Sequence, residues 1–272
     1  INILFTIGGD GTLHGAHEIY KEIEKRNLNI SVAGIPKTID NDINFIDKSF
    51  GFETASAIAD DIIHNAHNEA QGAYNGIALI KLMGRDSGFI AANAALSNQE
   101  VNFVIVPEMN FDLEGKKGFL NVLKERLIRR HHAVILIAEG AGQHFFENEE
   151  KKYDKSGNLI HNDIGIFLKD KISEKFNQEG FPHTIKYIDP SYIIRSAPAN
   201  AVDSKFCSIL AQNAVHAAMA GKTDFVVGHW NNEFTLLPIP LAIYERKKIN
   251  LESEFWWNVL ESTGQPIKMK ND

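Results

Sequence analysis

Short apolar runs alternate with helix-like segments along most of this chain. Runs typical of buried strands lie at 2–7, 30–35, 77–82, 102–106, 133–138, 184–188 and 224–229. Segments with apolar residues at helical spacing lie at 13–26, 53–70, 88–96, 116–130, 163–179, 203–220 and 245–261. This alternation is typical of parallel sheets that are covered by helices on both faces. The sequence therefore predicts an α/β fold.

Size and charge narrow the function classes. The chain has 272 residues, of which 44% are hydrophobic, enough for one large or two modest domains. It carries 28 basic and 35 acidic side chains, so nucleic-acid binding, which normally needs a basic face, is not supported. An anionic ligand must then be held by local devices such as helix N-termini, a few cations and a metal ion. No apolar run approaches membrane-spanning length.

A single cysteine, Cys207, excludes an internal disulfide and a multi-cysteine metal cluster, and it favours a reducing compartment. The segment 144–162 is rich in charge, Gly and Asn, which predicts a solvated loop, with a mobile edge of a site as the alternative. The chain begins at Ile1, directly in an apolar run, and we therefore expect a cropped or cleaved polypeptide.

A glycine-rich turn, Gly-Gly-Asp-Gly-Thr at 8–12, joins the first predicted strand to the first predicted helix. Glycines let backbone N–H groups approach phosphate oxygens, and a helix N-terminus favours an anion. Because Asp10 would repel phosphate directly, it suits a Mg²⁺ ion that bridges donor phosphates. A tight turn with a capping Asp is the structural alternative. NAD kinases and diacylglycerol kinases carry a very similar turn.

A second string, Pro-Lys-Thr-Ile-Asp-Asn-Asp at 36–42, directly follows the second predicted strand. Its carboxylates, Asp40 and Asp42, can take different tasks, one accepting a proton from a hydroxyl and the other steering a metal or a neighbouring side chain. Thr38 can hydrogen-bond a phosphate, and Lys37 adds a positive charge beside a donor. The structural alternative is a polar turn rich in Asx caps.

Two later strand ends carry groups that suit a phosphorylated sugar. The string Lys-Leu-Met-Gly-Arg-Asp-Ser-Gly at 81–88 places Arg85 where it can neutralise a transferring phosphoryl group. Met83 and Gly84 let the backbone lie close to a sugar. In Ala-Glu-Gly at 138–140, Glu139 can accept hydrogen bonds from sugar hydroxyls. A surface ion pair and a helix cap are the structural alternatives.

The last string, Asp-Pro-Ser-Tyr at 189–192, is followed by Arg195. An arginine here would bind a sugar phosphate, with Tyr192 hydrogen-bonding nearby and Lys186 as a second cation.

The five strings, in this order, resemble the phosphofructokinase family, and the resemblance runs from the glycine turn to about Pro240. It is strongest to the ATP-dependent enzymes of trypanosomes and related lineages, a branch that shares features with pyrophosphate-dependent enzymes. The resemblance implies phosphoryl transfer to the 1-hydroxyl of fructose 6-phosphate in glycolysis, with Mg²⁺ as the cofactor and a cytoplasmic or organellar location such as a glycosome.

The resemblance also implies a role for each residue. Asp40 is expected to be the general base, while Arg85 and Thr38 stabilise the transferring group and Asp10, aided by Asp42, holds the metal. Donor phosphates are expected at Gly9, Gly11, Thr12 and Lys37. The sugar phosphate is expected at Thr38, Asp40, Met83, Gly84, Arg85, Glu139, Lys186, Tyr192 and Arg195.

The implied architecture has two domains of mainly parallel sheets flanked by helices, with the active site in the cleft between them. Residues 1–50 and 195–245 are expected to form the donor domain, and residues 51–194 and 246–272 the fructose 6-phosphate domain.

The donor is expected to be ATP and not pyrophosphate. Pyrophosphate users resemble Gly-Gly-Asp-Asp followed by Pro-Lys-Thr, whereas this chain combines Gly11 with Lys37. A side chain at position 11 would fill the space of the α-phosphate.

The chain departs from the family pattern in four places. The family's N-terminal strand and Gly-rich turn, which contribute to the donor site, are not in this sequence. Bacterial relatives have His at Tyr192 and Arg at Lys186, and their basic residue from a neighbouring subunit falls near Gly76. We expect a homo-oligomer, a dimer or a tetramer, or a separate chain that supplies the N-terminal segment. A pyrophosphate-dependent enzyme, a lipid or NAD kinase and a non-catalytic subunit remain the alternatives.

Overall fold

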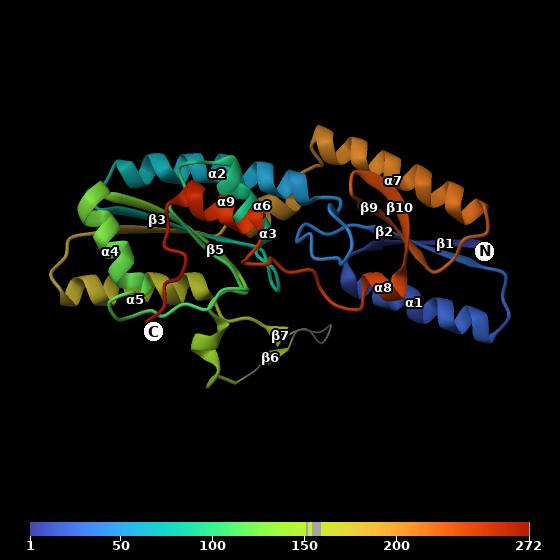
Figure 1. Ribbon diagram of the computed structural model, residues 1–272, viewed down its shortest axis with the longest axis horizontal. Coiled ribbons are helices and arrows are strands. Elements are labelled where there is room, and N and C mark those ends of the chain that lie inside the picture. The colour runs from blue at the N-terminus through green and yellow to red at the C-terminus, as the bar shows by residue number, and fades with distance from the viewer. Residues whose placement is uncertain (151, 154–158, 272) are drawn as a thin grey trace. The chain divides into compact units, whose positions relative to one another are not determined.

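Two sets of strands organise the chain into two units, seen in a computed structural model that describes residues 1–150, 152–153 and 159–271. Unit 1 comprises 1–55 and 197–247, and unit 2 comprises 56–196 and 248–272. These boundaries lie a few residues from the expected ones. Each unit has a mainly parallel sheet with helices against it, which confirms the α/β fold class (Figure 1). Within the described residues, no helix is both long and apolar enough to cross a membrane.

Unit 1 is built on a four-stranded sheet in the order β1-β2-β9-β10. Its elements are β1 (Ile3–Gly8), α1 (Asp10–Lys25), β2 (Ser31–Pro36), α7 (Ala201–Met219), β9 (Phe225–Trp230), β10 (Glu233–Pro238) and α8 (Ile239–Ala242). Strands β1, β2 and β9 are parallel, and β10 pairs antiparallel with β9. Because β1 and β2 are neighbours and parallel, the loops that follow them leave the same edge of the sheet.

The two faces of this sheet are separated by the alternation of side chains along each strand. Val32 and Val226 belong to the core under α1, together with Leu13 and Ile23 of that helix. The residues next to them on the strands belong to the opposite core, which α7 covers with Phe206, Leu210 and Ala214. Figure 1 shows α7 and α1 on opposite sides of the strands of unit 1. Burial of both faces explains why these strands have few polar residues.

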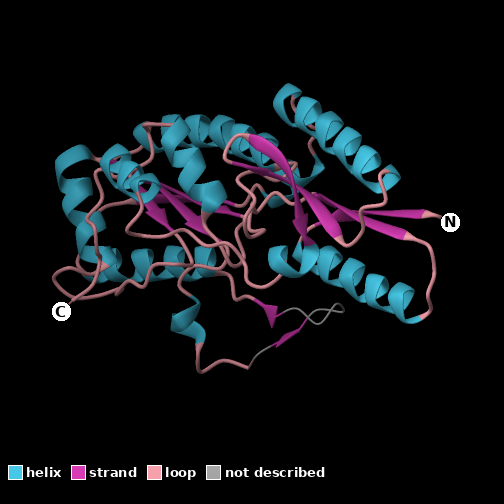
Figure 2. Cartoon of the chain, turned by 45° about the vertical axis from the view of Figure 1, so that its right-hand side comes forward, coloured by secondary structure: helices cyan, strands magenta, loops and turns pink. Residues whose placement is uncertain are grey.

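Unit 2 is built on an all-parallel sheet in the order β4-β5-β3-β8. Its strands are β3 (Gly76–Leu82), β4 (Phe103–Ile105), β5 (His132–Ala138) and β8 (Thr184–Ile188). Its helices are α3 (Phe89–Ser97), α4 (Phe119–Arg130), α5 (Ile164–Gln178), α6 (Ser191–Ser196) and α9 (Glu254–Thr263), and α2 (Phe52–Gln71) lies mostly within it. The strands β3 and β5 are almost wholly buried, and helices flank the strands on both sides in Figure 2.

The structure differs from the predicted elements at several points. The first helix begins at Asp10 and not near residue 13, because Gly9 already serves as its N-cap. The tail is helical only over Glu254–Thr263, where Ser253 caps the helix. The predicted solvated loop at 144–162 contains a short 3₁₀ helix, Gln143–Phe146, and the pair β6 (Lys152–Tyr153) with β7 (Leu159–Ile160), whereas 151 and 154–158 lie outside the described residues. The antiparallel strand β10 was not predicted.

Asp203, in the first turn of α7, does not cap that helix. The cap of α7 is Asn200, whose side chain accepts from the N–H of Asp203 at 2.9 Å. The fully buried Asp203 carboxylate accepts instead from the start of α2, at 3.1 Å from the N–H of Gly51 and 2.7 Å from that of Thr54. It therefore satisfies the exposed N–H groups of one helix from the first turn of another.

Candidate functional site

The glycine turn of unit 1 connects β1 to α1 through two glycines with different duties. A Cβ on Gly8 would lie 2.1 Å from the Thr12 hydroxyl oxygen, so the fold itself requires glycine there. A Cβ on Gly11 would meet nothing within 4 Å. Gly11 and Thr12 are exposed and belong to the first turn of α1, where helix N–H groups have no partner within the helix. Gly11 therefore leaves open space in front of a helix N-terminus.

The loop at 36–42 packs directly against this turn. Gly8 and Pro36 are partners in the β1–β2 register, and the N–H of Lys37 donates to the Gly8 carbonyl at 2.9 Å. A Cβ on Gly9 would lie 3.3 Å from the Cβ of Thr38. The structure thus brings together the residues expected to bind the donor and those expected to act on it, because two neighbouring strands end at the same level.

Asn41 holds the second loop in shape. Its backbone lies in the left-handed region at φ 53°, where Asn is one of the better tolerated residues. Its buried side chain accepts from the N–H of Ser49 at 3.0 Å and donates to the Asp47 carbonyl at 3.0 Å. The Ser49 hydroxyl donates to the Thr38 carbonyl at 2.7 Å. These bonds fix the backbone on both sides of Asp40.

Arg246 joins the two carboxylates that the sequence assigned to metal and catalysis. Its guanidinium lies 3.3 Å from Asp10 Oδ2 and 3.7 Å from Asp42 Oδ2. An antiparallel bridge between Ile43 and Arg246, together with a bond from the Lys247 N–H to the Asp42 carbonyl at 2.8 Å, places it there. The sequence analysis missed Arg246, which had been assigned to the second domain and to a tail helix.

Lys247 lies beside the same carboxylate but is mostly buried. Burial lowers its pKa to about 8, although the charges of Asp47 and Asp42 act in the opposite direction. Its ammonium donates to the Ile46 carbonyl at 2.5 Å. Lys247 therefore supports the chain that follows the loop at 36–42.

The chemistry of Asp10 and Asp42 fits a cation that is shared with phosphate. In this structure the two carboxylates flank one positive group, the Arg246 guanidinium. Over the described ranges, no group of three or more His, Cys, Asp or Glu side chains could hold a metal ion by itself. Mg²⁺ usually takes one or two carboxylates and completes its shell with water and phosphate oxygens, which suits this pair.

In unit 2, the ends of β3 and β5 interlock. The N–H of Glu139 donates to the Leu82 carbonyl at 2.9 Å, and the N–H of Gly140 donates to the Gly84 carbonyl at 3.0 Å. Gly84 has a φ of +132°, and a Cβ on Gly140 would lie 1.8 Å from the Arg85 carbonyl oxygen. The structure therefore places Met83, Gly84 and Arg85 next to Glu139. Arg85 and Glu139 are half-buried, whereas the Met83 side chain is buried.

His161 belongs to this neighbourhood and was not predicted. Burial lowers its pKa, and the positive charge of Arg85 lowers it further. The histidine follows β7 and precedes Asp163, the N-cap of α5. A neutral imidazole next to Arg85 adds no second positive charge at this place.

The remaining sugar-site candidates are not gathered in the same way. Tyr192 is 89% exposed, and Arg195 is also exposed, both on the short helix α6. Lys186 lies within β8 and pairs with Glu69 of α2 at 3.1 Å. The structure therefore brings Tyr192 and Arg195 onto one turn but sets Lys186 apart from it.

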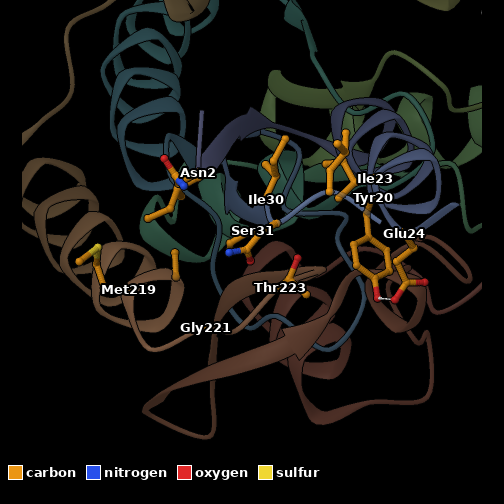
Figure 3. Close-up of a pocket in the computed structure, with 13 residues that line it drawn as sticks. Asn2, Tyr20, Ile23, Glu24, Ile30, Ser31, Met219, Gly221 and Thr223 are labelled. Atoms are coloured by element: carbon orange, nitrogen blue, oxygen red, sulfur yellow. Dashed lines mark hydrogen bonds between the residues drawn. The ribbon is translucent and has the colours of Figure 1, made fainter. Parts of the chain in front are cut away.

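A cavity of about 380 Å³ lies at the other end of the unit 1 sheet. Figure 3 shows its lining, which includes Asn2 and Ser31 at the amino ends of β1 and β2, and Thr223 before β9. Tyr20 donates to Glu24 at its rim, and that hydrogen bond raises the pKa of Tyr20 to about 12. The cavity is separate from the candidate loops, which leave the carboxyl ends of the same strands.

Comparison with known proteins agrees with the family resemblance of the five strings. Residues 1–218 match the sequence profile of the family described as phosphofructokinase. The chain belongs to the phosphofructokinase family. It is 57% identical over 277 residues to an ATP-dependent 6-phosphofructokinase of Borreliella burgdorferi, in an alignment that covers 100% of this chain and 62% of that protein. It is 44% identical over 270 residues to ATP-dependent 6-phosphofructokinase 2 of Arabidopsis thaliana, which covers 97% of this chain and 61% of that protein.

The chain therefore spans about six tenths of the length of the curated relatives that it matches. Solved structures agree on the fold. A pyrophosphate-dependent phosphofructokinase from Marinobacter aquaeolei matches with a TM-score of 0.75 at 20% identity, covering 97% of this chain and 67% of that one. Pichia pastoris phosphofructokinase in the T-state matches with a TM-score of 0.69 at 17% identity, covering 97% and 28%.

Proposed function

We propose that this protein transfers the γ-phosphoryl group of ATP to the 1-hydroxyl of fructose 6-phosphate. The observation that carries the proposal is the packing of the glycine turn against the loop at 36–42, with Gly9 close to Thr38 and open space at Gly11. A phosphate held at the start of α1 would lie beside the residues expected to act on it. Relatives named as ATP-dependent 6-phosphofructokinases, at 57% and 44% identity, support the same reaction.

Asp40 is the general base that accepts the proton of the 1-hydroxyl. It is half-buried in the loop, and its backbone N–H donates to the Thr38 hydroxyl at 3.2 Å, so the Thr38 side chain is tied to the Asp40 backbone. Asp42 is less suited to that task, because it is buried and its carboxylate pairs with the positive Arg246. Asp42 therefore acts by electrostatics, and Thr38 and Arg85 stabilise the transferring group.

The donor is held by the first turn of α1 and by its neighbours. The backbone of Gly9 and Gly11, the hydroxyl of Thr12 and the exposed ammonium of Lys37 bind donor phosphates. Asp10 would hold Mg²⁺, with Asp42 nearby, and the bound ion would neutralise phosphate charge. Arg246 holds these two carboxylates in place from the side.

The sugar phosphate is held by unit 2. Glu139 accepts hydrogen bonds from the sugar hydroxyls, and the backbone at Met83 and Gly84 lies against the ring. Tyr192 and Arg195 bind the 6-phosphate. The placement of Lys186 next to Glu69 supports at most an indirect role for that lysine.

Finer features of the family likeness complete the proposal. We infer membership of the ATP-dependent branch that is related to pyrophosphate-dependent enzymes, a homo-oligomeric enzyme, and a reducing compartment such as the cytoplasm. The exposed Tyr192 and Ile193 on α6 are consistent with a neighbouring subunit at that turn.

The proposal is tested by comparing two phosphoryl donors. Purified protein is given fructose 6-phosphate and Mg²⁺ with either ATP or pyrophosphate, and fructose 1,6-bisphosphate is quantified by mass spectrometry. Product with ATP and little with pyrophosphate is expected. Product with pyrophosphate alone would overturn the donor, and transfer to a lipid or to NAD but not to fructose 6-phosphate would overturn the acceptor.

A further inference from the structure

Lys81 connects three elements of unit 2 through its ammonium group. It is the penultimate residue of β3, and its side chain is 13% exposed. Its Nζ lies 2.6 Å from Asp163 Oδ2 and 2.9 Å from Asp189 Oδ2. In the parallel register Ile80 pairs with Ile188. Lys81 and Asp189 are the next residues after this pair, so they occupy equivalent positions on two neighbouring chain segments. The ammonium therefore ties the end of β8 and the start of α5 to β3.

Each of the two carboxylates also fixes a turn. Asp163 is the N-cap of α5 and accepts from the N–H groups of Gly165 at 2.9 Å and Ile166 at 3.0 Å. Asp189 accepts from the N–H of Ser191 at 3.1 Å and also from the Ser191 hydroxyl. Asp189 thus shapes the turn from which α6 begins.

All three groups of this cluster are charged near neutral pH. Burial alone would lower the pKa of Lys81, but its hydrogen bonds to Asp163 and Asp189 raise the pKa overall. Burial likewise opposes ionisation of the two carboxyl groups, and their bonds to Lys81 help to lower their pKa values. Removing the ammonium would leave two close carboxylates that repel each other in a partly buried place.

The turn that Asp189 shapes is only partly buried. On α6, Ile194 is buried at 3% exposure, whereas Tyr192 and Ile193 face solvent. Arg195 is exposed as well. The direction of these side chains therefore depends on how the start of the turn is fixed.

We propose that Lys81 is a positioning residue for the sugar phosphate. Through Asp189 it sets the turn that carries Tyr192 and Arg195 relative to the β3 end that carries Met83, Gly84 and Arg85. This inference rests on the proposed function, because it takes the turn to be the phosphate-binding element. It makes Lys81 part of substrate affinity without a direct contact to substrate.

The kinetic test compares three variants in the purified protein. Lys81→Met should raise KM for fructose 6-phosphate about 10- to 100-fold, the range expected for lost hydrogen bonds to charged groups, with kcat and KM for ATP changed about threefold or less. Lys81→Arg should restore most of the affinity, because a guanidinium can reach both carboxylates. Lys124→Met is the matched control, since Lys124 pairs with Glu179 at 2.6 Å on the surface of unit 2. That control should leave both KM values unchanged.

A double-mutant cycle tests the route through Asp189. Lys81→Met combined with Asp189→Asn should raise KM for fructose 6-phosphate no more than the worse single variant. Fully additive effects would overturn that route. An unchanged KM for fructose 6-phosphate in folded Lys81→Met would overturn the proposal, as would an equal loss in kcat and both KM values.

Hydrogen exchange separates this inference from the proposed function. Amides of residues 191–196 should exchange faster in Lys81→Met and in Asp189→Asn than in the unaltered protein, whether or not the protein uses fructose 6-phosphate. Failure of the unaltered protein to turn over fructose 6-phosphate contradicts the proposed function alone. Unchanged exchange at 191–196 contradicts the positioning role. If Lys81→Met does not fold, Lys81→Arg and Asp189→Asn carry the same comparison.

Discussion

The two units present their candidate residues in different ways. In unit 1, two neighbouring parallel strands end in loops that bond to each other, so that Gly9 and Thr38 nearly touch. In unit 2, β3 and β5 end in a similar interlocked pair, but the third strand, β8, ends in an exposed turn that carries Tyr192 and Arg195. Backbone bonds between strand ends help to fix the first two sets, whereas the ion pair of Lys81 with Asp189 helps to fix the third. The positions of Tyr192 and Arg195 therefore depend more on neighbouring charged side chains.

A positively charged side chain supports the candidate residues in each unit. Arg246 reaches Asp10 and Asp42 in unit 1 from a distant part of the sequence, through an antiparallel bridge with Ile43. Lys81 reaches Asp189 in unit 2 from inside the motif itself. If the comparison is right, changes in unit 1 should alter donor use and changes at the β8 turn should alter sugar affinity.

The largest effect is expected at Asp40. Asp40→Asn removes the base but keeps the shape of the loop, so kcat should fall about a thousandfold while KM for fructose 6-phosphate changes little. Steady-state kinetics measures both. The matched control is Asp61→Asn, an exposed carboxylate on α2 that should leave kcat unchanged. A fall in kcat below tenfold would show that another group takes the proton.

The second largest effect is expected in the glycine turn, where Gly8 and Gly11 should respond differently to substitution. Gly11→Asp should fold normally, because its Cβ meets open space, but should lower kcat/KM for ATP about 100-fold by placing a negative side chain against phosphate. Gly8→Ala should instead lower the free energy of unfolding by about 1–3 kcal/mol, since its Cβ would clash with Thr12. Kinetics and urea unfolding of both variants test the contrast. Equal loss of stability in the two variants would contradict it.

A smaller effect is expected at Arg246. Arg246→Met leaves Asp10 and Asp42 without the group that holds them together, and KM for ATP should rise about tenfold. The Mg²⁺ concentration needed for half-maximal rate should change as well. Arg26→Met is the control, because Arg26 pairs with the exposed Glu22 on the surface of α1. An unchanged KM for ATP and an unchanged Mg²⁺ requirement would remove Arg246 from the donor site.

The smallest effect concerns Lys247 and stability. Burial lowers its pKa from the ordinary 10.5 to about 8. Between these values the unfolded chain binds more protons than the folded chain, so the free energy of unfolding rises with pH, and this contribution is lost as the pH falls through about 8. Urea unfolding between pH 7 and 10.5 should show a smaller rise in Lys247→Met. Equal slopes in the two proteins would contradict a lowered pKa.

Local patterns in the sequence were sufficient to predict much of the fold. The apolar runs at 77–82 and 133–138 correspond closely to β3 and β5, since buried parallel strands need little else. The strand β10 was missed because its pairing with β9 depends on a tight turn at Asn231 and Asn232, whose positive φ angles the composition did not reveal.

Some residues of the candidate site could likewise be predicted from the sequence, and others could not. Residues within one motif, such as Thr38 and Asp40, could be predicted because they are neighbours in the chain. Arg246 and His161 could not, because tertiary pairing brings them to Asp42 and Arg85 from other elements. Lys81 was part of a predicted motif, but its ion pairs with Asp163 and Asp189 follow from strand register.

The division of labour between the two units is tested most directly by one pair of arginine variants. Steady-state KM values for both substrates are measured in Arg246→Met and Arg195→Met beside the unaltered protein. Arg246→Met should raise KM for ATP about tenfold and leave that for fructose 6-phosphate within twofold, whereas Arg195→Met should do the reverse. Equal increases for both substrates in both variants, or the crossed pattern, would contradict a donor site in unit 1 and a sugar-phosphate site on the β8 turn.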